Sequence, residues 1–529
     1  VNELEETVIV GYGTQRKISN IGAQSSMKLE DIKTPSASLT TTLAGRLAGV
    51  VAVQRTGEPG KDAADIWIRG IATPNTATPL ILVDGVERAF NDIDPEDIES
   101  LTTLKDASAT AVYGVRGANG VIIIKTKPGK IGKPTISADY YESFTRFTKM
   151  VDLTDGVSYM KAANEALRND GLATKFTDSQ IQNTILGKDQ YLYPNVDWLN
   201  EIFNDWGHNR RVNVNVRGGS EKVSYYASVS YFNETGMTVT DKSINTFDSK
   251  MKYSRYNFTT NLSIDVTPTT KVEIGAQGYL GEGNYPAISS KDLYNAAMSI
   301  SPVEYPKMFF INGEAYIPGR STNNNFNNPY SQATRRGYDN LTKNQIYSNL
   351  RITQDLDMLT KGLKLTAMYA FDVYNEIHVH QDRAESTYYF LDTNVPYDLD
   401  GQPILQRIYT GTNVLSYKQE TSGNKKTYLE ASLNYDRAFG DHRVSGLFLF
   451  NQQQKLLYPK GTLEDAIPYR MMGIAGRATY SWKDRYFAEF NIGYNGAENF
   501  SPKNRYGTFP AYGVGWVISN ERFWEPLSK

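Results

Sequence analysis

The stretch Pro79–Lys127, PLILVDGVERAFNDIDPEDIESLTTLKDASATAVYGVRGANGVIIIKTK, decides how the first part of the chain is interpreted. Its first two apolar runs are separated by Asp84-Gly85, a dipeptide typical of a two-residue hairpin turn. A short helix that begins at Asp94, a glycine-rich corner and a strand over Val121–Lys125 are expected to follow. The pattern predicts a small globular α+β unit.

From about residue 134 onward the chain has a different pattern. Segments of roughly ten residues alternate between apolar and polar side chains, and we count about twelve of them. Val212, Val214 and Val216, for example, alternate with polar neighbours. An apolar face and a polar face on each strand are typical of a transmembrane β-barrel, because lipid covers the outside and water the inside.

The connections between these segments support the same interpretation, because short and long ones alternate. We expect short turns at 218–222, 267–271, 359–362, 439–442 and 483–484. Long polar loops are expected at about 150–210, 233–252, 282–343, 376–424, 455–472 and 496–507, the first of them with a helix over Ser158–Arg168. Barrels of the outer membrane have short periplasmic turns and long outer loops.

About twelve strands are too few to surround the N-terminal unit. Barrels wide enough to hold a plug have roughly 22 strands, and an open sheet would leave unpaired edges in the bilayer. We therefore expect roughly half of the barrel to lie outside this sequence.

Composition excludes several classes of protein. Lys and Arg number 56 against 58 Asp and Glu, so no basic field argues for nucleic acid. The apolar runs fall far short of the roughly 20 residues that a membrane helix needs. The absence of cysteine excludes a disulfide framework and thiol chemistry.

Three patterns that resemble catalytic or ligand sites are better explained structurally. Gly114–Gly120 resembles a phosphate loop, but it follows a helix and opens a strand, so its glycines are expected to serve tight or positive-φ turns. The acids after Asp94 suit a helix N-terminus. His378 and His380 share one face of a strand, but no third ligand is evident nearby, so we predict no metal site and no cofactor.

Two features near the N-terminus remain open to alternative interpretations. The β-prone run Thr7–Val10 is either a free strand that can add to the sheet of another protein or an ordinary first strand of the globular unit. Arg69, at the end of a predicted strand over Ile66–Gly70, is expected to pair with a carboxylate of the barrel wall. The alternative is an ordinary surface arginine.

Several motifs of the first quarter of the chain closely resemble the plug of SusC-like TonB-dependent outer-membrane transporters. They are Leu43–Val50 (LAGRLAGV), Ile68-Arg69-Gly70, Leu82–Gly85 (LVDG), Val112–Val121 (VYGVRGANGV) and Ile124–Lys127 (IKTK). Within them the resemblance implies plug motif roles for Arg69, Gly70, Asp84, Gly85, Tyr113, Gly114, Arg116, Gly117, Asn119 and Gly120. The run Glu6, Thr7, Val8, Ile9 and Val10 is similar to the TonB box of that family, which favours the free-strand interpretation. The barrel part resembles the family in its general pattern of alternating segments and in its closing segment, Gly515-Trp516 and Ser519–Glu521.

The fold class that follows is mainly β. It is a transmembrane antiparallel β-barrel, with about twelve strands here and about 22 in the full protein, and with an N-terminal α+β plug. We expect a periplasmic lead with the TonB box at residues 1–13, the plug at 14–130 and the first half of the barrel at 131–529. The chain departs from the family in length and in showing no extension domain ahead of the box.

The resemblance implies import of a nutrient too large for porins, commonly an oligosaccharide and alternatively a peptide, with no chemistry done on it. The implied partners are TonB, energised by ExbB–ExbD, a SusD-like surface lipoprotein and outer-membrane lipid. The alternative, from another class of protein, is a barrel that binds ligands at the surface or acts as an adhesin and does not transport.

Aromatic side chains in the long loops are candidates to stack on sugar rings, although such residues also form membrane girdles and loop cores. They are Tyr316, Phe326, Tyr330, Tyr388, Tyr389 and Tyr409.

Overall fold

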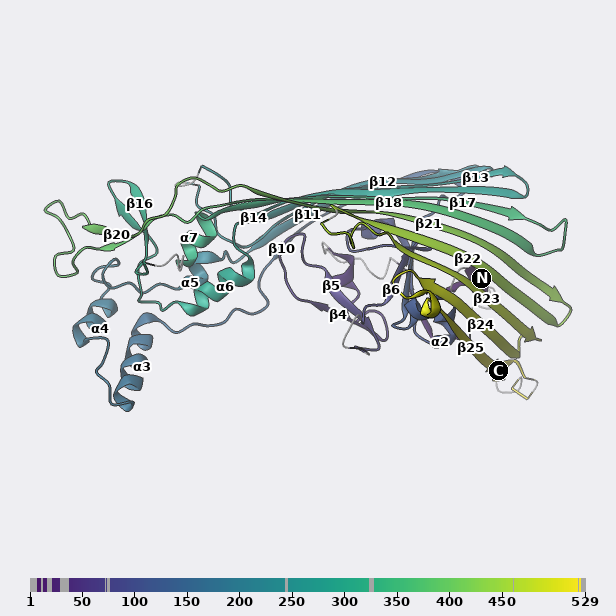
Figure 1. Cartoon of the computed structure of the whole chain (residues 1–529), viewed down its shortest axis with the longest axis horizontal. Coiled ribbons are helices and arrows are strands. Elements are labelled where there is room, and N and C mark those ends of the chain that lie inside the picture. The colour runs from purple at the N-terminus through teal and green to yellow at the C-terminus, as the bar shows by residue number, and fades with distance from the viewer. Residues whose placement is uncertain are drawn as a thin grey trace.

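The computed structural model describes residues 7–10, 13–16, 21–28, 38–71, 73, 77–242, 246–322, 328–459, 461–521 and 523–524. A long antiparallel sheet arches over a small domain formed by the N-terminal part of the chain (Figure 1). We call the described residues up to Thr126 the plug and the large sheet the wall.

The plug is built on a five-stranded sheet in the order β3-β8-β9-β6-β7. Its strands are β3 (Gln24–Lys28), β6 (Leu80–Val83), β7 (Val86–Glu87), β8 (Ile98–Leu104) and β9 (Val121–Thr126). A separate hairpin joins β4 (Val50–Gln54) to β5 (Ala64–Ile68), and β1 (Thr7–Val10) pairs with β2 (Gly13–Arg16). The helical pieces are α1 (Leu39–Thr42), α2 (Ala107–Thr110) and the 3-10 turns η4 (Pro95–Asp97) and η5 (Ala111–Gly117).

The predicted Asp84-Gly85 turn is confirmed. Both residues have positive φ, 53° and 92°, as a tight hairpin between twisted strands requires. The Asp84 carboxylate also accepts hydrogen bonds from the backbone N–H of Thr126, at 2.9 Å, and from its hydroxyl, at 2.8 Å. The turn is thereby tied to the end of β9, which runs parallel to β6.

The prediction of a helix from Asp94 is wrong beyond the first turn. Asp94 caps η4 by accepting a hydrogen bond from the N–H of Glu96, and the chain then enters β8 at Ile98. Strand β8 lies between β3 and β9. Pairing on both sides and the β-branched Thr102 and Thr103 outweigh the local helix signal.

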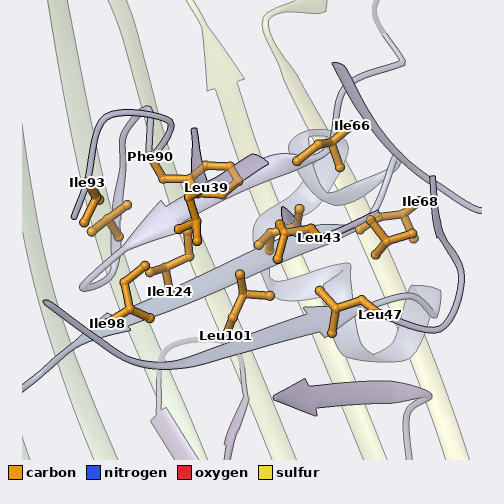
Figure 2. Packing of buried hydrophobic residues seen from close by; sticks show 13 residues of the cluster. Leu39, Leu43, Leu47, Ile66, Ile68, Phe90, Ile93, Ile98, Leu101 and Ile124 are labelled. Atoms are coloured by element: carbon orange, nitrogen blue, oxygen red, sulfur yellow. The ribbon is translucent and has the colours of Figure 1, made fainter. Parts of the chain in front are cut away.

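The plug has a hydrophobic core of its own between its sheet, α1 and the β4–β5 hairpin. Figure 2 shows Leu39, Leu43, Leu47, Ile66, Ile68, Phe90, Ile93, Ile98, Leu101 and Ile124 in this core. Burying each aliphatic side chain of this kind contributes roughly 1.5–3 kcal/mol. The plug therefore owes its shape to its own packing as well as to the wall.

The wall has twelve antiparallel strands in the order β10-β11-β12-β13-β14-β17-β18-β21-β22-β23-β24-β25. They are β10 (Gly132–Thr145), β11 (Gly207–Gly219), β12 (Val223–Thr235), β13 (Lys252–Thr267), β14 (Thr270–Pro286), β17 (Gly337–Asp355), β18 (Leu363–Asp382), β21 (Lys418–Phe439), β22 (His442–Tyr458), β23 (Tyr469–Trp482), β24 (Tyr486–Ala497) and β25 (Tyr506–Trp516). The predicted number of strands and the alternation of short turns with long loops are both confirmed. We call the two ends of the wall the short-turn end and the long-loop end.

The two faces of the wall follow the predicted alternation. On β18, Met368, Ala370 and Asp372 are buried toward the plug, whereas Leu365 and Tyr369 point outward and are 40% and 48% exposed. Residues of one parity on each strand therefore face the interior, and those of the other parity form the apolar outer surface that lipid requires.

The long loops fold into an ordered layer at one end of the wall (Figure 1). This layer contains α3 (Gly156–Asn169), α4 (Asp178–Ile185), α5 (Trp198–Ile202), α6 (Ser290–Ser299), α7 (Pro329–Thr334) and a small sheet of β15 (Phe309–Ile311), β16 (Glu314–Pro318), β19 (Thr387–Phe390) and β20 (Leu405–Tyr409). The predicted helix Ser158–Arg168 lies within α3. No helix in the described ranges is long and apolar enough to cross a bilayer.

Gly114 offers a test of how closely plug and wall fit. It has φ 58° and ψ −141° inside η5, and a Cβ atom there would lie 1.8 Å from Oδ1 of Asn495 on β24. We expect Gly114→Ala to lower the free energy of unfolding of the full-length protein by about 1–3 kcal/mol, because of strain and overpacking. Gly57→Ala, where no atom lies within 4 Å of the added Cβ, is the control. Equal urea midpoints for both variants in detergent would contradict the prediction.

Candidate functional site

Charged residues of plug segment 87–99 face basic residues on the inner side of the wall. Asp94 accepts a hydrogen bond from Nε of Arg211 at 2.9 Å, and Asp92 pairs with Arg255 at 2.8 Å. Pairs of the same polarity join Glu99 to Arg217 and Glu87 to Lys426, both at 3.1 Å. The wall therefore presents mostly cations to an acidic plug segment.

Arg88 forms an ion pair of the opposite polarity, with the cation on the plug and the carboxylate on the wall. It is the most deeply buried of these ion pairs. Its guanidinium donates to both carboxylate oxygens of Asp372 on β18, at 2.6 and 3.0 Å. The two side chains are 0% and 6% exposed. The guanidinium also lies 4.8 Å from the centre of the Tyr347 ring. Such a pair costs much to bury but is strongly destabilising to break on one side only.

Asp97 is held by hydroxyl groups rather than by cations. Its carboxylate accepts hydrogen bonds from Tyr226, Ser228 and Thr259 of the wall, at 2.5 to 2.8 Å. Burial, followed by the nearby charge of Asp94, raises the pKa of Asp97 above its usual range. Plug segment 87–99 is thus joined to the wall by polar contacts, which water is able to replace as they break.

A cavity of about 920 Å³ lies between plug segment 87–94 and the inner face of the wall. Amide and phenol side chains are prominent in its lining. The amides are Asn91, Asn257, Gln277, Gln345, Asn424 and Gln453, and the tyrosines are Tyr279, Tyr347, Tyr374 and Tyr469. Its size suits a ligand of several rings or residues.

The charges around this cavity nearly balance. Five basic side chains, Arg88, Arg116, Lys343, Lys426 and Lys455, face four acids, Glu87, Asp92, Asp94 and Asp372. Burial opposes ionisation of Glu87, but Lys426 and Arg116 prevail and lower its pKa to about 2. The cavity therefore favours polar ligands without a large net charge.

A second cavity of about 950 Å³ lies at the tip of the β4–β5 hairpin. This tip contacts the loop layer, because Glu58 accepts a hydrogen bond from the N–H of Ser290 on α6, at 2.9 Å. The Tyr285 hydroxyl donates to the carbonyl of Pro59 at 2.7 Å, and Lys61 lies 4.0 Å from the centre of the Tyr285 ring. Burial raises the pKa of the neighbouring Asp62 to about 6. The plug thus touches both the wall and the long loops.

The predicted pairing of Arg69 with the barrel wall is wrong. Its guanidinium pairs with Asp106 of the plug at 2.7 Å and is 56% exposed. Arg69 and Gly70 have positive φ, 60° and 93°, so the chain turns away after β5. Because Asp106 lies in the loop after β8, a partner within the plug is close at hand.

The glycine-rich corner forms part of the junction between plug and wall. Tyr113 is buried with Leu447 and Leu449 of β22, and Arg116 pairs with Glu87 and reaches Gln453 of the wall at 3.5 Å. The other motif residues shape the turn. The Asn119 amide donates to the Thr78 carbonyl at 3.4 Å, Gly120 has φ 86°, and a Cβ on Gly117 would lie 2.6 Å from the Thr110 carbonyl.

The run similar to a TonB box lies outside the five-stranded sheet of the plug. Thr7–Val10 forms β1, which pairs with β2 in a two-stranded sheet of its own. Arg16, at the end of β2, donates to the carboxylate of Asp484 in the turn between β23 and β24, at 3.1 Å. Glu6 lies outside the described residues. The TonB-binding role of this run stays a prediction.

The aromatic residues predicted in the long loops lie apart from the cavity at plug segment 87–94. Tyr316 and Tyr388 contact each other edge to face with ring centres 5.0 Å apart, Arg320 lies 4.5 Å from the Tyr389 ring, and Tyr409 pairs with Thr387. All four belong to the small loop sheet, whose β16 and β20 lie far from the plug in Figure 1. Phe326 lies outside the described residues.

Tyr330 lies inside the loop layer rather than on its surface. It is 7% exposed in the core of the loop layer, and its hydroxyl donates to Asp241 at 2.7 Å. The substrate contact expected of Tyr330 stays a prediction.

Sequence reasoning missed the cavity tyrosines, such as Tyr279 and Tyr374, and a carboxylate beside the paired histidines. Alternation shows that a residue shares a face with its second neighbours, but not at which depth of the wall it lies. The register of β17 against β18 sets Asp339 directly opposite His380. That pairing joins segments separated by a turn and could not be read from either strand alone.

Comparison with known proteins agrees with this architecture. Residues 16–121 match the family described as TonB-dependent Receptor Plug Domain. TonB-dependent receptor P3 of Formosa agariphila is 27% identical over 99% of this chain and 50% of its own length. TonB-dependent receptor SusC of Bacteroides thetaiotaomicron is 27% identical over 98% of this chain and 51% of its own length. The chain thus spans about half the length of the curated relatives it matches.

Solved structures show the same fold. The structure of the RagAB peptide transporter aligns with a TM-score of 0.73 at 20% identity, over 95% of this chain and 58% of that one. The outer membrane transporter YddB from Escherichia coli aligns with a TM-score of 0.55 at 12% identity, over 94% and 59%. The plug match, the relatives along the whole chain and the plugged wall agree: residues 16–121 form a TonB-dependent receptor plug domain, and the chain as a whole is similar to SusC-like TonB-dependent receptors of the Gram-negative outer membrane.

Proposed function

We propose that this protein imports an oligosaccharide across the outer membrane by TonB-dependent transport. The observation that carries the proposal is the cavity above plug segment 87–94, with its amide and tyrosine lining and nearly balanced charge. Amides pair with sugar hydroxyls, and aromatic rings pack against the apolar faces of sugars.

A peptide is the second candidate substrate. The same amides are able to pair with a peptide backbone, and the RagAB peptide transporter shares this fold. A surface-binding or adhesin barrel is the alternative of another class, and it would need neither a plug that can move nor a TonB box.

The partners follow from the same proposal. A SusD-like lipoprotein would cover the long-loop end, and TonB, energised by ExbB–ExbD, would pair with the run Glu6, Thr7, Val8, Ile9 and Val10 by strand addition. Outer-membrane lipid would surround the apolar face of the wall. Residues 1–13 would form the periplasmic lead, 14–130 the plug and 131–529 the first half of the barrel.

The mechanism rests on the polar attachment of the plug. Force applied to β1 passes along the β1–β2 hairpin to Arg16 and its contact with Asp484. Beyond that point the plug is held by ion pairs and hydroxyl contacts, which water can replace as they break, and by apolar contacts such as those of Tyr113 with Leu447 and Leu449. Displacement of segment 87–94 would then open the floor of the cavity. In this mechanism the solute is carried across the membrane chemically unchanged.

Calorimetry on the full-length receptor with its lipoprotein tests the substrate class. Panels of oligosaccharides and of short peptides are titrated, and we expect saturable binding of one class of oligosaccharide. Tyr279→Ala, on the cavity wall, should weaken that binding about two- to tenfold, since an aromatic contact contributes roughly 0.5–1.5 kcal/mol. Tyr369→Ala, on the outer face of the same wall, is the matched control. Binding of peptides alone, or equal affinity of both variants, would overturn the oligosaccharide proposal.

A further inference from the structure

A cluster of two imidazoles and a carboxylate lies on the inner face of the wall, near its long-loop end. His378 and His380 are two residues apart on β18, and Asp339 on β17 is directly opposite His380. All three have the parity that faces the plug, the same as Asp372 and Tyr347. The potential ligand atoms of the cluster lie within 4.8 Å of one another.

The distances suit one ion between these three side chains. Nδ1 of His380 lies 3.3 Å from one oxygen of Asp339, and Nδ1 of His378 lies 3.6 Å from the other. A tetrahedral ion with ligands about 2.0–2.1 Å away places neighbouring ligand atoms about 3.3 Å apart. The two rings are nearly parallel, at 12°, with centres 5.6 Å apart.

A second carboxylate orients the His378 ring. Nε2 of His378 lies 2.7 Å from Glu376, which also accepts a hydrogen bond from the Tyr374 hydroxyl, and Nε2 of His380 lies 3.9 Å from Glu420. A proton held on Nε2 of His378 leaves the lone pair of Nδ1 directed at Asp339. A histidine between a metal and an outer carboxylate is the usual arrangement around protein-bound transition ions.

The inner atoms lack the partners that this arrangement calls for. Within the described part of the chain, the structure shows no hydrogen-bond partner for Nδ1 of His378 or for Oδ1 of Asp339, and both atoms are buried. Nδ1 of His378 lies 3.6 Å from Oδ2, the other oxygen of Asp339, and two acceptors at that distance repel unless a cation lies between them. We propose that Asp339, His378 and His380 bind a divalent transition-metal ion such as Zn²⁺.

The donor set favours this class of ion. Imidazole and carboxylate ligands suit Zn²⁺, Ni²⁺ and Cu²⁺ better than Ca²⁺ or Mg²⁺, which prefer oxygen donors alone. Three protein ligands leave a fourth position of the ion open. His378 and His380 follow Tyr374 and Glu376 on the same face of β18. Because Tyr374 lines the cavity at plug segment 87–94 and the histidines do not, the site lies at the rim of that cavity.

Metal titration of the full-length receptor, purified in detergent without a histidine tag, tests the proposal. We expect one saturable Zn²⁺ site that weakens at least about 100-fold in His378→Gln, His380→Gln and Asp339→Asn, because loss of an outer partner alone costs 10–100-fold. Glu376→Gln, which removes only the orienting carboxylate, should lose about 10–100-fold. His442→Gln is the matched control, since its imidazole contacts Tyr480 at the short-turn end.

Cu²⁺ as a spectroscopic probe identifies the ligands. The electron paramagnetic resonance spectrum should show coupling to two imidazole nitrogens in the native protein and to one in His378→Gln. Retained heat-modifiable migration on gels shows that each variant is folded. The proposal is overturned if the native protein shows no saturable Zn²⁺ binding, which would mean that a proton occupies the site. It is also overturned if Zn²⁺ binding is unchanged in Asp339→Asn.

Discussion

Replacing Arg88 with methionine is expected to destabilise the plug within the wall by about 3–5 kcal/mol. The substitution leaves the Asp372 carboxylate charged, 6% exposed and without its guanidinium partner. It also removes the cation beside the Tyr347 ring. Urea unfolding of the full-length receptor in detergent, followed by proteolysis of the plug, measures the loss.

A matched surface pair and a double variant separate the charge effect from general damage. Arg55→Met breaks the exposed Arg55–Asp65 pair of the same plug, whose side chains are 70% and 48% exposed, so it should cost less than about 1 kcal/mol. Arg88→Met combined with Asp372→Leu should recover much of the lost stability, since a buried ion pair can often be replaced by apolar residues. Equal losses in Arg88→Met and Arg55→Met would show that the buried pair does not anchor the plug.

Replacing Ile9 with proline is expected to reduce uptake to the level of cells without TonB while solute binding is retained. Proline lacks the backbone N–H that strand addition uses, and it fixes φ near −65°. Ile9 lies in β1, which forms a two-stranded sheet with β2 and is not part of the five-stranded sheet of the plug. Uptake of labelled solute by whole cells and calorimetry on the purified receptor measure the two properties separately.

Ile9→Thr is the control for this prediction, because it keeps both the backbone N–H and a β-branched side chain. Uptake should remain near the native level if backbone pairing carries the interaction. Unchanged uptake in Ile9→Pro would remove the TonB-box assignment and favour a barrel that binds without transport. Loss of binding in the same variant would instead indicate damage to the plug.

Local sequence chemistry predicted much of the fold and less of the site. The Asp84-Gly85 turn, the strand over Val121–Lys125 and the twelve alternating strands depend on turn residues and on period-two patterning, which act within a few positions. The helix expected after Asp94 was wrong because pairing of β8 with β3 and β9 outweighs a local cap. Arg69 was assigned to the wall because its neighbours in sequence do not reveal Asp106.

The sequence by itself therefore determined the class of the protein: a plug motif followed by membrane strands with short turns and long loops. It also determined which residues of each strand share a face, since side chains alternate along a strand. Only the tertiary structure decided which depth of the wall meets plug segment 87–94, which tyrosines line the cavity and that Asp339 lies beside His378 and His380. The reason is physical, because strand register and plug docking are settled by contacts between segments far apart in the chain.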